Sequence, residues 1–123
     1  MTPSAIAEAP FRLSARPTEA EILAKYFRVL ADPARLRILE ALVAEEELSV
    51  GELVDRVGLA QPNVSNHLAC LRWCGFVEAR REHRTVYNRI ADDRVKDVID
   101  VARQLLAGNE EHVAACRMTR ATR

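Results

Sequence analysis

Hydrophobic and polar residues follow two different periods along this chain. Apolar residues recur at helical spacing in five stretches, which predicts amphipathic helices at residues 18–31, 33–44, 49–57, 61–73 and 92–107. Thr18 and Glu21 have the form of a capping box, and Asp32-Pro33 supplies an acidic cap followed by a proline at the first helical position. Gly58 is expected to end the third helix.

After Gly75 the hydrophobic period changes to that of a strand. Residues 76–81 and 85–90 alternate apolar and polar positions, which predicts a two-stranded hairpin with a charged tip at residues 82–84. Residues 45–48 are interpreted as a polar break, and Asp92 is expected to cap the last helix. The order of four helices, a hairpin and a helix predicts a mainly α fold with a small β-hairpin, the winged helix-turn-helix.

The fourth predicted helix carries a polar face beside an apolar stripe of Val64, Leu68 and Leu71. In a helix-turn-helix the second helix enters the major groove, where Asn and Gln side chains match adenine. We therefore predict that this helix binds DNA, although a solvated polar face has the same pattern. The predicted base-contacting residues are Gln61, Asn63, Ser65, Asn66 and His67.

The net charge of the whole chain is zero, so only the local distribution of charge indicates which surface can bind DNA. Basic residues concentrate in the hairpin, whereas acids cluster at residues 45–47 and 92–100. Local charge decides whether a face can bind phosphate. We predict that the hairpin tip contacts phosphate or the minor groove through Arg80, Arg81, His83 and Arg84.

Two segments of the chain resemble a known family of regulators. Residues 30–39, LADPARLRIL, and residues 63–71, NVSNHLACL, are similar to the two signature stretches of the ArsR/SmtB metalloregulators. The resemblance covers about residues 20–107. It implies a homodimeric winged-helix repressor that binds an operator upstream of metal-resistance genes and releases it when metal binds. It also implies a dimer interface built mainly from the first and last helices, residues 18–31 and 92–107.

The family places metal ligands at several positions, and this sequence lacks two of these sites. Ser49 and Gly51 stand where one type of site has its Cys-x-Cys, and the last helix lacks the spaced Asp and His of another, since His112 is the only nearby histidine. Cys70 and Cys74, four residues apart on one helix, are close enough to bind a single ion, and Cys116 is the candidate third ligand.

Three thiolates favour thiophilic ions. We therefore rank Cd(II) and Pb(II) above As(III), with Zn(II) lower. The pattern resembles the CmtR-type cadmium/lead sensors, but the N-terminal arm contains no cysteine here. Whether Cys116 binds within its own subunit or across the dimer stays open. A metal that joins these thiols is expected to reposition the fourth predicted helix, residues 61–73, which carries the predicted base-contacting residues and which we call the reading helix.

Other classes of function remain open at this point. The cysteines are also compatible with small buried hydrophobes or with a thiol redox switch, although a bridge between consecutive turns of one helix would constrain little. An effectorless DNA-binding regulator is a further alternative. No glycine-rich phosphate loop or Ser/His/Asp set is present, so we do not expect an enzyme.

Composition and termini complete the expected organisation of the 123-residue chain. Neither a secretory signal nor a membrane-spanning stretch is apparent, so we expect a cytoplasmic protein with reduced thiols. Residues 1–17, with three prolines, are expected to form a flexible N-terminal arm. Residues 18–107 are expected to form the DNA-binding and dimerisation domain, and residues 108–123 a tail that carries Cys116.

Overall fold

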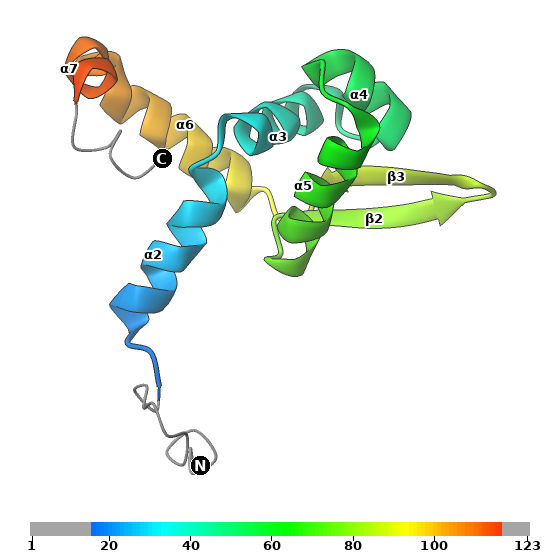
Figure 1. The fold of residues 1–123 in the computed structure, drawn as a ribbon, viewed down its shortest axis with the longest axis horizontal. Helices are drawn as coiled ribbons and strands as arrows, with labels where there is room; N and C mark the ends of the chain where they lie inside the picture. Colours follow the sequence, from blue (N-terminus) through cyan, green and yellow to red (C-terminus); the bar gives the residue numbers. More distant parts are fainter. Residues whose placement is uncertain (1–15, 117–123) are drawn as a thin grey trace.

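The computed structural model describes residues 16–116, so most of the predicted N-terminal arm and the last seven residues, 117–123, lie outside the described part. Short helices dominate, with one small sheet (Figure 1). The elements in chain order are α2 (Glu19–Leu30), α3 (Pro33–Glu45), β1 (Leu48–Ser49), α4 (Val50–Val57), α5 (Gln61–Trp73), β2 (Val77–Glu82), β3 (Thr85–Ile90), α6 (Arg94–Ala107) and α7 (Glu110–Ala115). This is the predicted winged helix-turn-helix arrangement, with the short α7 added.

Side-chain caps start the first helices where the sequence predicted them. The Thr18 hydroxyl accepts from the Glu21 backbone N–H at 3.1 Å, and the Glu21 carboxylate accepts from the Thr18 N–H at 2.7 Å. The Asp32 carboxylate accepts from the N–H of Ala34 at 2.8 Å at the start of α3. These bonds satisfy N–H groups that the first helical turn leaves without partners.

A left-handed residue makes the turn between α4 and α5. Gly58 has φ 73°, a conformation that residues with a Cβ rarely adopt, and its N–H donates to the carbonyl of Val54 at 2.9 Å. Helix α5 then begins at Gln61 with Pro62 in its first turn, where the missing N–H costs little. The predicted turn and helix bounds are confirmed.

The core lies where α3, α4 and α5 meet the base of the hairpin. In Figure 1 the three helices gather on one side of the molecule, the hairpin extends beyond them, and α2 and α6 extend the other way. Helix α2 buries no residue, and α6 buries only Val95 and Ile99. The most deeply buried apolar side chains are Ile38, Leu39, Leu42, Leu53, Val64, Leu68, Leu71 and Phe76.

The sheet contains one strand that the sequence did not predict. Its order is β1-β3-β2, with all neighbours antiparallel. Residues 45–48 were expected as a polar break, but Leu48 is buried and pairs with Asn88. A strand of two residues is too short to show an alternating pattern.

The β2–β3 hairpin, which we call the wing, and the helix α6 begin or end within a residue or two of the predicted positions. Strand β2 runs to Glu82, which leaves His83 (φ 59°) and Arg84 as the turn. Helix α6 begins at Arg94, and the Asp92 carboxylate accepts from the Arg94 N–H at 2.9 Å and from its guanidinium at 2.7 Å. These bonds lower the pKa of Asp92 to about 2.

Candidate nucleic-acid interface and thiol site

Helix α5 presents most of the predicted base-contacting residues on its outer side. Gln61, Asn63 and Asn66 are exposed, whereas Ser65 is half-buried. The apolar stripe of Val64, Leu68 and Leu71 is completely buried, as predicted, and fixes which side of the helix faces outward. Exposed amide side chains on the N-terminal half of this helix are suited to hydrogen bonding with base edges.

His67 occupies a different position from the other predicted DNA contacts. It is half-buried, and its Nδ1 accepts a hydrogen bond from Nε of Arg35 on α3 at 3.2 Å. The same guanidinium donates through Nη1 to the carbonyl of Val29 on α2 at 3.1 Å. Arg35 therefore connects α2, α3 and α5, and the imidazole faces the protein on at least one edge.

In the wing, ion pairs engage part of the basic charge. The Arg80 guanidinium donates to both carboxylate oxygens of Glu47, at 2.7 and 2.8 Å, and to Glu82 at 2.8 Å. It also lies over the Tyr87 ring, 5.0 Å from the centroid. The bonds to Arg80 lower the pKa of Glu47. Arg80 was predicted to bind DNA, but in this structure its donors point to protein carboxylates.

The tip of the hairpin carries the basic groups that remain available. Arg81, His83 and Arg84 are exposed. Within residues 16–116, neither Arg81 nor Arg84 forms an ion pair. Within the described residues, the arginines of the hairpin that have no carboxylate partner therefore lie at its tip.

Cys70 lies in the last turn of α5, and Cys74 is the residue that caps the end of this helix. Cys70 and Cys74 are half-buried thiols, and Cys74 packs against the core. Burial raises the pKa of Cys74, and the neighbouring Cys70 thiol raises it further, while the charges of Arg35 and Lys25 act in the opposite direction. The pair thus combines two soft ligands with nearby positive charge.

Within one chain, Cys116 does not complete this site. It is half-buried and follows α7, which Figure 1 places well away from α5. No three His, Cys, Asp or Glu side chains in residues 16–116 are grouped as a metal site. Within residues 16–116 the structure brings Cys70 and Cys74 together but does not bring Cys116 to them.

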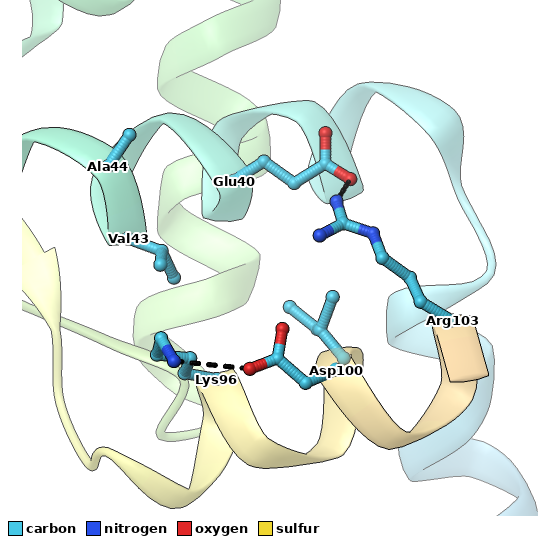
Figure 2. Close-up of a pocket in the computed structure, with 7 residues that line it drawn as sticks. Glu40, Val43, Ala44, Lys96, Asp100 and Arg103 are labelled. Atoms are coloured by element: carbon cyan, nitrogen blue, oxygen red, sulfur yellow. Dashed lines mark hydrogen bonds and ion pairs between the residues drawn. The ribbon is translucent and has the colours of Figure 1, made fainter.

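A hollow of about 260 Å³ lies between α3 and α6 (Figure 2). Glu40 of α3 and Arg103 of α6 form an ion pair at one end, and Lys96 bonds to Asp100 at 3.1 Å at the other. Each cation already has a carboxylate partner, so the hollow has no surplus positive charge for an anion. The Glu40–Arg103 ion pair links α6 to α3, which packs against both helices of the helix-turn-helix.

Exposed apolar side chains mark one further surface. Helices α2 and α6 were predicted to form a dimer interface, and both carry large apolar residues that the single chain leaves exposed. Phe27 of α2 lines one hollow together with Val98 and Leu106 of α6, and an exposed apolar surface of this kind is typical of a protein contact. The residues are Ile22, Leu23, Tyr26, Phe27, Val98, Val101, Leu105 and Leu106.

Two residues near these sites were missed by the sequence analysis. Arg35 was noticed only as part of a motif, and Glu47 only as part of an acidic cluster. Their partners are 32 and 33 positions away, so no local pattern indicates the contacts. No helix of residues 16–116 is long and apolar enough to cross a membrane.

Comparisons with known proteins agree with this geometry. Residues 32–79 match the family described as "Bacterial regulatory protein, arsR family". The chain is 40% identical over 99 residues to a probable mercury resistance operon repressor of Streptomyces lividans, covering 80% of this chain and 78% of that protein. It is 48% identical over 73 residues to the HTH-type transcriptional regulator CmtR of Mycobacterium bovis, covering 59% of this chain and 61% of the other.

Solved structures give the same result. The crystal structure of Rv0081 from M. tuberculosis superposes with a TM-score of 0.73 at 39% identity, covering 81% of this chain and all of that one. The homodimeric winged helix-turn-helix DNA-binding domain of Mb0332 from Mycobacterium bovis gives a TM-score of 0.67 at 28% identity, covering 81% and 95%.

A buried apolar stripe, an outward polar face and a basic hairpin define this chain as a winged helix-turn-helix DNA-binding protein. The chain is similar to these relatives in sequence as well as in fold. The chain belongs to the arsR family of bacterial regulatory proteins and is a transcriptional repressor of that family. The proteins of this family are DNA-binding regulators and not enzymes.

Proposed function

We propose that this chain is a homodimeric repressor that leaves its operator when a thiophilic ion, Cd(II) or Pb(II), binds to Cys70, Cys74 and Cys116. The observation that carries the proposal is the half-buried pair Cys70 and Cys74 at the C-terminal end of α5, the helix that carries the polar reading face. As(III) or Zn(II) is the alternative effector. The name of the S. lividans relative, a mercury resistance operon repressor, supports a metal-linked role.

Operator binding is assigned to α5 and the wing tip. The outward positions of Gln61, Asn63 and Asn66 support base contacts in the major groove. Arg81 and Arg84 are the wing groups that we assign to phosphate, because other arginines of the hairpin bond to carboxylates. Two such units in a dimer would bind two half-sites about one helical turn apart.

Dimerisation is assigned to α2 and α6. Their exposed apolar side chains favour contact with a second copy, and the homodimeric state of the Mb0332 domain supports it. Such a dimer would also supply a Cys116 from the other subunit. That supply matters because the thiol pair of one chain has no third ligand within residues 16–116.

The pair fits a soft ion in its chemistry. Thiolates are preferred ligands of such ions, and each thiol must lose its proton before it binds. Lys25 and Arg35 lie near Cys74, and their charges favour the thiolate form. An ion bound to Cys70, Cys74 and Cys116 would join the end of α5 to the segment that follows α7.

The coupling to DNA is expected to run through α2 and α5. The Tyr26 and Phe76 rings stack with centroids 4.6 Å apart, and Arg35 bonds to both Val29 and His67. A ligand held by Cys70 and Cys74 therefore alters contacts between the reading helix and a helix of the proposed dimer interface. Release follows if the new spacing of the two reading helices no longer matches adjacent major grooves, and DNA should then weaken metal binding by the same factor.

The direct test uses Cys70→Ser and Cys74→Ser in an operator mobility-shift assay with and without Cd(II). Both variants should bind the operator as the original chain does and should not release it with Cd(II). If either variant dissociates at the same Cd(II) concentration as the original chain, the thiol assignment is wrong. A parallel absorbance titration should show thiolate-to-metal charge-transfer bands in the original chain and weaker bands in each variant.

The third ligand is tested by Cys116→Ser, with Ala115→Ser as a matched control on the neighbouring residue. The control should bind Cd(II) as the original chain does, whereas Cys116→Ser should lower the affinity. Mixed dimers of Cys70→Ser and Cys116→Ser chains distinguish ligation within a subunit from ligation across the dimer. Absence of both the absorbance and the operator response in the original chain would indicate a regulator without a metal effector.

A further inference from the structure

The two faces of the wing, the β2–β3 hairpin, carry different charged residues, and the strand register determines which residues lie on each face. Residues directly opposite each other on paired strands share a face, so Glu78, Arg80 and Glu82 of β2 lie on the same face as Tyr87 and Arg89 of β3. We call this the outer face. Together with Glu47 it has three acids and two arginines, all joined in ion pairs. A face with a negative balance is a poor surface for phosphate.

The opposite face begins at the core and continues toward the tip. Val77 and Asn88 on this face are buried at the base of the hairpin. Arg81 alternates onto the same face farther out, where it is exposed. The phosphate-binding charge of the wing therefore comes from Arg81 and the turn residue Arg84, and Arg80 points away from it.

The Glu47–Arg80 pair crosses the whole sheet. Glu47 directly precedes β1, and Arg80 lies on β2, yet the strand order β1-β3-β2 leaves these two strands without backbone hydrogen bonds between them. The guanidinium bridges the gap above Tyr87 of the middle strand. Backbone pairing between β1 and β3 covers only Leu48 and Ser49, so the wing is otherwise attached at this edge by two residue pairs.

We propose that Glu47 and Arg80 are positioning residues of the wing, which fix its angle to the helix-turn-helix so that Arg81 and Arg84 meet the DNA backbone. Glu47 follows α3, and Arg80 lies toward the outer end of β2, so the pair holds the projecting part of the hairpin to the body of the domain. A bidentate arginine–carboxylate bond has the fixed geometry that this role requires. Arg80 itself makes no contact with phosphate.

The electrostatic effect and the positioning effect of Glu47 predict opposite changes in operator affinity for the same variant. Glu47→Gln removes a negative charge near DNA, so electrostatics alone would strengthen operator binding. Loss of wing positioning should instead weaken it by roughly fivefold, within the range of coupling within one residue network. Glu78→Gln is the matched control, because it removes the same charge from the outer face but breaks only the pair with Arg89 inside the hairpin. This control should bind as well as the original chain or more tightly.

Arg80→Lys separates positioning from charge. Lysine retains the positive charge but cannot bond to both carboxylate oxygens, so operator affinity should fall as in Glu47→Gln, with the slope of log affinity against log salt unchanged. The Glu47→Gln/Arg80→Lys double variant should bind no more weakly than either single variant. Thermal unfolding of each variant checks that the domain is folded at the assay temperature.

Two results would overturn the proposal. If Glu47→Gln binds the operator more tightly and its salt slope steepens by about 0.9, Arg80 becomes a phosphate contact once Glu47 is removed. The pair would then restrain DNA binding instead of positioning the wing. An affinity for Arg80→Lys equal to that of the original chain would likewise contradict the requirement for bidentate geometry.

Discussion

Arg35 of α3 donates from Nε to Nδ1 of His67 at 3.2 Å, which ties α3 to the middle of the reading helix α5. The acceptor must be an unprotonated nitrogen, so the imidazole carries its proton on Nε2 in this arrangement. Because the same guanidinium bonds to Val29, loss of the imidazole leaves one arm of a half-buried cation without its partner.

His67→Ala should therefore lower stability more than it alters base recognition. We expect a loss of about 1 kcal/mol in the free energy of unfolding, the usual net value of such a bond. Asn66→Ala on the exposed side is the matched comparison, with unfolding within about 0.5 kcal/mol of the original chain and a loss of operator affinity of about 1–3 kcal/mol. Chemical denaturation and operator titration of the two variants measure both quantities. The reverse pattern would assign His67 to the DNA.

Metal affinity should rise with pH across the neutral range. Burial raises the pKa of Cys74, so its thiol keeps its proton at pH 7, and metal binding must displace that proton. Each displaced proton increases the apparent affinity by up to about tenfold per pH unit below the thiol pKa. Cd(II) titrations in buffers of different ionisation enthalpy, between pH 6 and pH 8, count the protons released. A pH-independent affinity would show that thiols are not the ligands.

Arg84→Ala should reduce the electrostatic component of operator binding. Removing one phosphate contact lowers the slope of log affinity against log salt by about 0.9 and weakens binding to specific and unrelated DNA alike. Arg89→Ala is a suitable control, because Arg89 bonds to Glu78 at 2.6 Å on the outer face. Fluorescence anisotropy at several salt concentrations measures both slopes. Equal losses of slope in the two variants would contradict the assignment of phosphate binding to the tip.

Leu105→Lys should shift the chain toward monomers. Leu105 on α6 is 76% exposed in the single chain and makes little contribution to the core, so a charge there affects chiefly the proposed interface. Analytical ultracentrifugation should detect a monomer at concentrations where the original chain is a dimer, with operator affinity reduced in parallel. Ala114→Lys on the short α7 provides an exposed control with the same added charge. A dimer of unchanged stability would exclude this part of α6 from the interface.

The parts of the fold that follow from the sequence are those with local causes. Thr18, Asp32 and Ser49 are helix caps whose partners lie two or three residues away, and each formed as its pattern indicates. The reading helix was predicted with its observed bounds because its apolar stripe, Pro62 and the preceding glycine agree. Consistency between neighbouring signals makes such segments predictable.

The candidate sites were predicted in residue type more than in geometry. The pairing of Cys70 with Cys74 follows from helical spacing, which is local. The engagement of Arg80 by Glu47 and of His67 by Arg35 depends on how distant elements pack, and no pattern within either segment indicates it. The same holds for the proposed third ligand, Cys116, because the spacing of residues along the chain does not indicate whether it lies near Cys70 and Cys74.

Asn88 restricts how the wing can assemble. It is completely buried on the middle strand, and its Nδ2 donates to the carbonyl of Leu48 at 3.3 Å. A shift of the hairpin by one residue would turn Asn88 outward and bring Tyr87 or Arg89 toward the core. The same shift would turn Ile90, which packs against the core, outward, so the apolar residues and the amide favour the same alignment. The amide of Asn88 thus joins the strand alignment of the hairpin to the short strand β1, and the position of the proposed DNA-binding tip depends on this alignment.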